Sequence, residues 1–394
     1  MLKDYFEFQN PVKICAGYKA LDNIGVELAE LGGKRAMIIS DKGVEGAGLL
    51  KTVLKAFDET EITVAAVFTD IPSDSSYDTV RETAEIYRAK NCDSLVAVGG
   101  GSVIDTAKGA NILASLGTDD LAQYAGAGTI KRALNPFIVV PTTSGTGSEA
   151  TLVAVIADKK KNQKSLFLSK YLMPNTAIID PRMTLSLPPI ITAATAMDAL
   201  THSIEAFTCL GKNPLSDAYA TSSIKLIAPN ILRVIKNPND KEGRYNLAVA
   251  STMAGVAFSN SMVGLVHTLG HSVGAVCHVH HGIAMNVFLP IVLEYNLPKV
   301  SNYVGELLLP LAGADAYSST SINDRPVKTI DFIRNLKDEL YSAVGLPRTL
   351  GETGKVAKDK FAEIAKTAIG DASITYNPVE MDYNDALALL EKAF

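Results

Sequence analysis

The histidines are the residues of this sequence whose type and spacing point most directly to chemistry. All six lie between positions 202 and 281 of the 394-residue chain, and the rest of the sequence contains none. Imidazole is the commonest metal ligand in proteins and the usual group for moving protons near neutral pH. A metal or proton-transfer site is therefore expected in this stretch, which contains His202, His267, His271, His278, His280 and His281.

The first part of this stretch combines a carboxylate with a histidine. In TAATAMDALTHSIEAF, Asp198 and His202 are four residues apart in an uninterrupted helical pattern, so both side chains would project from one helix face. Glu205 follows on that face, and Glu205 or a backbone carbonyl is expected to orient His202 from behind. The alternative is that Asp198 and His202 only form a hydrogen-bonded pair between packed helices.

The second part, GLVHTLGHSVGAVCHVHHG, is predicted to form a second helix. It presents His267 and His271 at the same spacing and reaches His281 immediately before Gly282. Two helices could thus bring one carboxylate and up to three imidazoles to a common point, which is a suitable ligand set for a borderline divalent ion. The alternative is a set of unrelated surface or core histidines.

Two loops that follow apolar segments could hold a nucleotide. The segment SLVAV leads through glycines into a helix, where the backbone can approach a phosphate and the helix N-terminus supplies free N–H groups. The segment PFIVV ends in PTTSGTGSEAT, which offers hydroxyls. The alternative is that neither loop binds a ligand, so that the glycine loop is only a tight turn and the PTTSGTGSEAT segment only a flexible loop. The glycine loop also differs from the usual GxGxxG fingerprint. The residues concerned are Gly99, Gly100, Gly101 and Ser102, then Thr142, Thr143, Thr146 and Ser148.

Asp41 stands at the end of the apolar run AMIIS. A carboxylate at this place can accept hydrogen bonds from an adenosine ribose, and its charge would repel a 2′-phosphate, which favours NAD over NADP. The alternative is that Asp41 only caps a turn or a helix.

The elements that must position these residues alternate between short apolar β-rich runs and helical stretches up to about residue 182. This pattern is typical of a parallel sheet with crossover helices. A β-hairpin is expected at 151–158 and 164–169, joined by the charged stretch KKKNQ. Beyond Pro188-Pro189 the pattern is helical. We therefore predict an α/β nucleotide-binding domain at 1–182 and an all-helical domain at 183–394, with strands at 36–40, 62–68, 94–99 and 136–142.

Composition excludes several other classes of protein. A net charge of −5 leaves no broad basic surface for nucleic acid. The N-terminus lacks the apolar run of a signal peptide or anchor, and no later segment is typical of a membrane span. The four cysteines form no CxxC pair, which suits a reducing compartment. We expect a cytoplasmic protein whose partners are small molecules.

Four segments together resemble the iron-containing, or group III, alcohol dehydrogenase family, and the resemblance covers essentially the whole chain. It implies a Rossmann-like NAD-binding domain, an all-helical metal-binding domain, and an oxidoreductase that interconverts a small primary alcohol or diol and its aldehyde with NAD(H). A homodimer or larger homo-oligomer is also implied, and YFEF near the N-terminus could pair with a second copy. The segments are GGGSVIDTAK (99–108), PTTSGTGSE (141–149), DALTHSIEA (198–206) and GLVHTLGHSVGAVCHVHHG (264–282).

The resemblance also implies roles for individual residues. Iron, with zinc as the other candidate, would be bound by Asp198, His202, His267 and His281. His271 would line the substrate site without binding metal and could relay a proton. NAD would lie along the loops described above and Asp41, and Lys164 of the hairpin would reach the nicotinamide ribose.

Other functions remain open at this point. A glycerol-dehydrogenase-like zinc enzyme or a dehydroquinate-synthase-like lyase would have a related architecture, but PTTSGTGSE and the third histidine, His281, argue against both. A non-catalytic nucleotide-binding scaffold would not need the four metal ligands. The sequence does not indicate which alcohol is the substrate.

Overall fold

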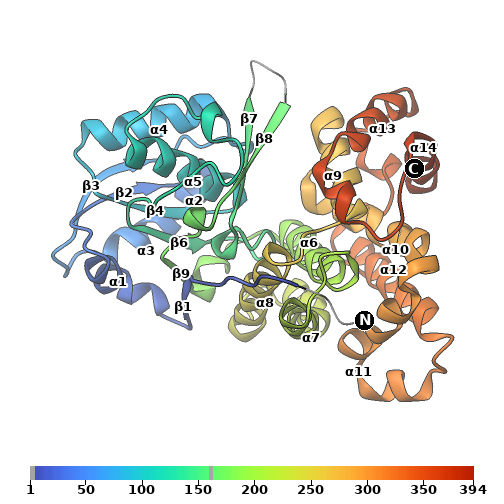
Figure 1. Cartoon of the computed structure of the whole chain (residues 1–394). Helices are drawn as coiled ribbons and strands as arrows, with labels where there is room; N and C mark the ends of the chain where they lie inside the picture. The colour runs from blue at the N-terminus through green and yellow to red at the C-terminus, as the bar shows by residue number, and fades with distance from the viewer. Residues whose placement is uncertain (1–4, 159–162) are drawn as a thin grey trace. The chain divides into compact units, whose positions relative to one another are not determined.

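The computed structural model describes residues 5–158 and 163–394. These residues form two compact units, one spanning Gln9–Leu187 and the other Pro188–Phe394 together with the residues up to Phe8. In Figure 1 the first unit runs from blue to green and the second from green to red. The domain boundary expected after residue 182 stays a prediction.

The first unit is built on a six-stranded sheet in the order β1-β9-β6-β4-β2-β3, and every pairing in it is parallel. The four strands predicted from the sequence are confirmed as β2, β3, β4 and β6. Strands β1 and β9 were not predicted, because four residues are too few to show a pattern. The strands are β1 Lys13–Ala16, β2 Arg35–Ile39, β3 Thr63–Phe68, β4 Ser94–Gly99, β6 Phe137–Pro141 and β9 Thr176–Ile179.

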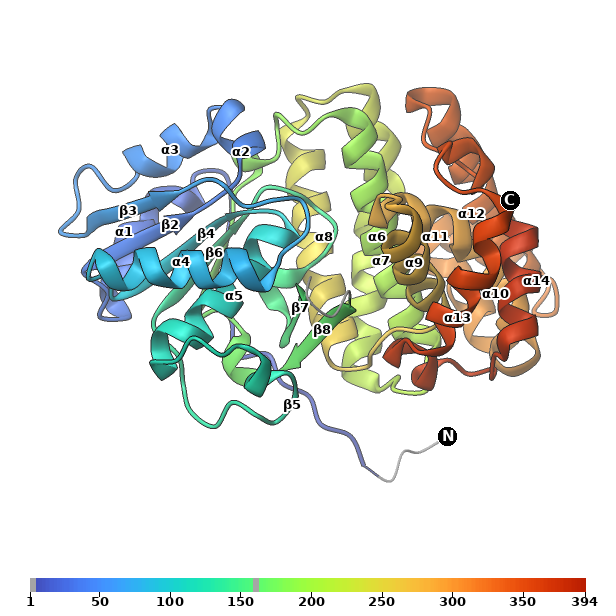
Figure 2. The ribbon, with the colours of Figure 1, turned by 90° about the horizontal axis from the view of Figure 1, so that it is seen from above.

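Helices cover both faces of this sheet (Figures 1 and 2). Alternate strand residues pack to opposite sides, so Ile38 contacts the cluster that includes α1–α3, whereas Met37 contacts the cluster that includes α4 and α5. Burial on both faces explains why the central strands are continuously apolar. The helices are α1 Ile24–Glu30, α2 Lys42–Gly46, α3 Leu49–Lys55, α4 Tyr77–Ala89 and α5 Gly101–Leu116.

The predicted hairpin is confirmed as the antiparallel pair β7 (Val153–Asp158) and β8 (Gln163–Leu168). It forms a second sheet in which β8 also pairs with β5 (Gly126–Ala127). Residues 159–162 of the charged connection lie outside the described residues.

The second unit is helical, and no strand occurs in 188–394, all of which the structure describes. The predicted all-helical character of this part of the chain is therefore confirmed. Helix α6 is its centre and packs against α7, α8 and α10. The helices are α6 Pro189–Thr208, α7 Pro214–Lys236, α8 Lys241–Ser259, α9 Leu265–Cys277, α10 His281–Glu306, α11 Leu308–Ser319, α12 Arg325–Val344, α13 Phe361–Ile369 and α14 Tyr383–Ala393.

None of the helices in the described part of the chain combines the length and the apolar character needed to cross a bilayer.

Candidate metal centre

One aspartate and three histidines come together in the second unit. Each offers one ligand atom, and these atoms all lie within 4.8 Å of one another. Among the described residues, this is the one group of Asp, Glu, His and Cys side chains with the geometry of a metal site. Its members are Asp198, His202, His267 and His281, whereas His271, His278 and His280 lie outside it.

Helix α6 supplies Asp198 and His202 from the interior of the unit. Every residue from Thr192 to Thr208 is buried, because small side chains allow neighbouring helices to pack closely around α6. The helix and the spacing predicted for Asp198 and His202 are confirmed. The Oδ1 atom of Asp198 is the meeting point: it lies 3.8 Å from His202 Nδ1, 3.9 Å from His267 Nε2 and 3.3 Å from His281 Nε2.

His281 reaches the cluster from a third helix, so the single helix predicted for the second histidine segment is wrong. Helix α9 ends at Cys277, and His278 has a left-handed backbone conformation with φ 54°, which ends the helical path. Helix α10 then begins at His281. The next residue must be small, because a Cβ on Gly282 would lie 2.3 Å from the carbonyl oxygen of Ala194 in α6.

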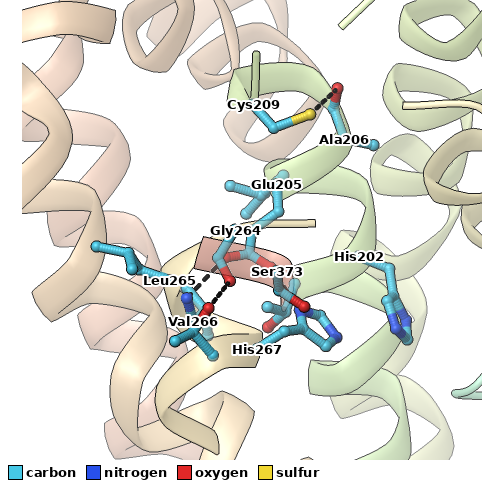
Figure 3. A network of polar contacts seen from close by, with 12 residues as sticks. His202, Glu205, Ala206, Cys209, Gly264, Leu265, Val266, His267 and Ser373 are labelled. Atoms are coloured by element: carbon cyan, nitrogen blue, oxygen red, sulfur yellow. Dashed lines mark hydrogen bonds and ion pairs between the residues drawn. The ribbon is translucent and has the colours of Figure 1, made fainter. Parts of the chain in front are cut away.

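Glu205 contacts His267, and the expectation that it would orient His202 is wrong. The Oε2 atom of Glu205 contacts Nδ1 of His267, and its Oε1 atom accepts a hydrogen bond from the Val266 N–H at 2.7 Å (Figure 3). His202 is held by ring stacking instead, with 4.2 Å to Phe258 and 4.5 Å to His267 between ring centroids. The first turn of α9, which the sequence could not place, determines which histidine Glu205 meets.

The protonation states of Asp198, His202 and His267 suit metal binding. Burial would raise the pKa of Asp198, but the neighbouring imidazoles of His202 and His281 outweigh it and hold that pKa well below its usual value. Burial lowers the pKa of His202 to about 3 and that of His267 well below the usual value. Near neutral pH the carboxylate is therefore charged and these imidazoles are neutral, which are the forms that bind metals.

The burial of these ligand atoms also fits a metal ion. Asp198 Oδ1, His202 Nδ1 and His267 Nε2 are fully buried and have no hydrogen-bond partner among the described residues. A buried polar atom without a partner costs about 1–3 kcal/mol. A divalent ion at the common point would satisfy all three. One carboxylate and three imidazoles form a donor set suited to Fe²⁺ or Zn²⁺.

His271 lies beside the cluster, one turn after His267 on α9. Its ring stacks on that of His281 with 5.4 Å between centroids, and its Nδ1 lies 3.0 Å from Asp371 Oδ2. The pKa of Asp371 is lowered: burial opposes this, but the hydrogen bond to His271 and the charge of His271 favour the ionised form. Since the His271 side chain is 38% exposed, it connects the buried cluster with the surface of the unit.

The two loops predicted to hold a nucleotide lie side by side in the first unit. The Thr142 N–H donates to the carbonyl of the last residue of β4 at 3.1 Å. A Cβ on Gly100 would lie 3.4 Å from the Thr143 side chain, and a Cβ on Gly101 would lie 3.0 Å from that of Thr146. Gly100 is the N-cap of α5 and has no side chain to cap it, so N–H groups of the first turn can face an anion.

A network of hydrogen bonds around Lys108, which was not predicted from the sequence, holds these loops together. Lys108, only 1% exposed, donates at 2.8 Å to each of the carbonyl oxygens of Ser148, Thr151 and Val153. Asp105 accepts from the Ser148 hydroxyl at 2.9 Å and from a backbone N–H of β7 at 2.9 Å. Both residues belong to GGGSVIDTAK, and a lysine in the apolar face of a helix was the available signal.

Three other residues expected at the nucleotide site make contacts of their own. Asp41 is the N-cap of α2, and its Oδ1 atom accepts a hydrogen bond from the Val44 N–H at 2.9 Å. One carboxylate oxygen of Asp41 therefore caps a helix, which was the alternative to ribose binding. The Ser102 hydroxyl donates to the Ser73 carbonyl. Lys164 is exposed and pairs with Asp74 at 3.3 Å. The roles of these residues toward NAD stay predictions.

The first unit thus has a parallel sheet with a glycine loop at the start of α5, and the helical unit has a buried aspartate-histidine cluster, a combination suited to a nucleotide and a metal ion. Comparison with known families agrees. The model described as iron-containing alcohol dehydrogenase matches residues 11–181, and the model described as Fe-containing alcohol dehydrogenase family, C-terminal, matches residues 192–394.

Individual relatives match over almost their whole length. The chain is 32% identical over 379 residues to the NAD-dependent methanol dehydrogenase of Bacillus methanolicus, covering 96% of this chain and 97% of that protein. It is 33% identical over 394 residues to the 1,3-propanediol dehydrogenase of Klebsiella pneumoniae, covering 99% of each. The solved structure of a 1,3-propanediol oxidoreductase superposes with a TM-score of 0.94 at 32% identity, covering 99% of this chain and 100% of that chain.

The chain belongs to the iron-containing alcohol dehydrogenase family. It is an enzyme, and its relatives are alcohol and diol dehydrogenases. The predicted family, fold class and enzyme class are confirmed. The family and the aspartate-histidine cluster support iron and NAD(H) as the cofactors.

Proposed function

We propose that this enzyme interconverts a small primary alcohol or diol and its aldehyde, with iron held by Asp198, His202, His267 and His281 and with NAD(H) as the redox partner. The metal assignment rests on one observation. Buried ligand atoms without a hydrogen-bond partner among the described residues, His202 Nδ1 and His267 Nε2, lie close to Asp198 Oδ1, and so does His281 Nε2. When bound, the metal supplies a Lewis acid for the substrate oxygen, and the nicotinamide exchanges the hydride.

The first unit supports the NAD assignment. We assign the dinucleotide to the paired loops around Gly99–Ser102 and Thr142–Thr146, with the second carboxylate oxygen of Asp41 available to a ribose. Lys164 is the proposed contact to the nicotinamide ribose, for which it would exchange its surface ion pair with Asp74. In this assignment residues 1–182 are the NAD-binding domain and 183–394 the metal and substrate domain.

We assign proton relay to His271. Its hydrogen bond to Asp371 fixes the ring, and its partial exposure gives a path to solvent. A His271→Ala variant should lose about 10²-fold in kcat for alcohol oxidation near neutral pH, because a positioned acid-base group typically contributes about 10²–10⁴-fold. Metal content should stay unchanged. Wild-type kcat with a wild-type pH profile would show that His271 has no such role.

The experiment that tests the proposed function is anaerobic reconstitution of the metal-stripped protein with Fe²⁺ or with Zn²⁺. NADH absorbance is then followed with short aldehydes and diols. Iron-dependent turnover that is lost in His267→Ala is the expected result. Turnover with zinc alone would assign the enzyme to zinc-dependent chemistry, and no turnover with either metal would contradict the proposal. The same assay ranks methanol, ethanol, butanol, 1,2-propanediol with lactaldehyde, and 1,3-propanediol.

We further propose a homodimer or larger assembly in the cytoplasm. The four cysteines are free, as in a reducing compartment. Tyr5 is 75% exposed and Phe6 42%, so the segment expected to pair with a second copy is available, although residues 5–8 form no strand in the single chain. A monomeric mass in analytical ultracentrifugation at micromolar concentration would contradict the assembly.

A further inference from the structure

Glu205 contacts a residue of the metal cluster without belonging to the cluster. It lies on α6 one turn after His202 and is only 4% exposed. Both of its oxygens are engaged: Oε1 accepts from the Val266 N–H at 2.7 Å, and Oε2 meets Nδ1 of His267 (Figure 3). Burying such a carboxylate without a specific use would be costly.

The two ring nitrogens of His267 have different surroundings. Nδ1 contacts the Glu205 carboxyl group, whereas Nε2 is buried and has no hydrogen-bond partner among the described residues. The carboxylate oxygen of Asp198 is 3.9 Å from Nε2, which is too long for a hydrogen bond. A neutral imidazole carries one proton, and which nitrogen holds it depends on the hydrogen bond that the other nitrogen makes. With the proton on Nδ1, the lone pair of Nε2 points to the cluster.

Glu205 also fixes the position of α9. The N-cap of this 13-residue helix is Gly264, which has no side chain to cap it. The N–H groups of its first two residues, Leu265 and Val266, are instead accepted by Asn377 Oδ1 at 3.2 Å and by Glu205 Oε1 at 2.7 Å. The Glu205 oxygen thus does what an N-cap side chain does at other helices, because it accepts from an N–H group of the first turn. The same side chain thus locates both the backbone of α9 and the ring that the helix carries.

We infer that Glu205 is a positioning residue that selects the tautomer of His267 with the proton on Nδ1 and aims Nε2 at the metal. The inference rests on the proposed metal centre and goes beyond it, because it assigns a role to a residue that is not a ligand. Residues that orient metal-bound histidines are typically worth about 10–100-fold in metal affinity.

The test is Co²⁺ binding to the metal-stripped full-length protein, compared between wild type and Glu205→Gln. Glutamine keeps an oxygen for the Val266 N–H, so α9 stays capped, but its NH₂ group then faces Nδ1 and favours the proton on Nε2. We expect Co²⁺ affinity to fall about 10–100-fold. In ¹⁵N-histidine NMR of the metal-free protein, the His267 proton should move from Nδ1 to Nε2, a change that a loss of packing alone would not produce.

Asp371→Asn is the matched control, because it changes a second carboxylate that is hydrogen-bonded to Nδ1 of a histidine outside the cluster, His271. Its Co²⁺ affinity should equal that of wild type. Unchanged affinity in Glu205→Gln, or a wild-type His267 protonated on Nε2, would overturn the inference. The wild-type NMR measurement decides the matter even if the variant does not fold. Failure of wild type to bind Co²⁺ would instead contradict the proposed metal centre.

Discussion

Replacing Asp198 with asparagine should remove metal retention and lower kcat/KM by about 10³-fold or more. The estimate follows because Lewis-acid stabilisation is worth several kcal/mol and each 1.4 kcal/mol is about tenfold in rate. Asp198 carries the only negative charge among the four clustered side chains, and its Oδ1 lies within 3.9 Å of a nitrogen of each histidine. Asparagine keeps the shape but loses the charge. Metal content by mass spectrometry and NADH-linked turnover give the measurement.

The control for Asp198→Asn is His280→Ala. His280 immediately precedes the clustered His281 but is itself exposed and outside the cluster. The His280→Ala variant should keep its metal and its turnover. Metal retention in Asp198→Asn, or loss of metal in His280→Ala, would show that the ligand set is assigned wrongly.

Replacing Lys108 with methionine should produce the largest loss of stability. Three carbonyls would lose their donor, and Asp105 would lose the nearby positive charge. Breaking such a buried charged network costs about 3–5 kcal/mol. For a unit of this size 1 kcal/mol corresponds to roughly 2–4 °C, so Tm should fall by about 10 °C. NAD⁺ binding should weaken as well. Lys108 holds residues 148–153 against α5, and these residues directly follow the loop around Thr142–Thr146 that is assigned to the dinucleotide.

Thermal unfolding followed by circular dichroism and NAD⁺ titration measure both effects. Lys164→Met is the control for stability, because Lys164 is an exposed lysine whose ion pair with Asp74 is on the surface, where such pairs contribute little. Its Tm should stay close to that of wild type. An equal Tm for Lys108→Met and wild type would mean that the network does not hold the loop segment.

Features set by local pattern could be predicted from the sequence. Apolar runs identified β2, β3, β4 and β6, and the turn between two extended segments identified the β7–β8 hairpin, because strand and turn preferences act over a few neighbouring residues. The spacing of Asp198 and His202 gave their common helix face for the same reason. Together with four motifs in a fixed order, these patterns were enough to indicate the family.

Features that depend on distant contacts were decided by the tertiary structure. Glu205 meets His267, 62 residues away, because α9 begins beside α6, and nothing in the spacing of Glu205 could choose between two histidines. A left-handed residue at His278 ended α9, so that His281 entered from a separate helix. The partners of Lys108 lie 40–45 residues further along the chain. The periodicity of a sequence shows on which face of a helix or strand a side chain lies. Only the packing of the elements determines which residues that face contacts.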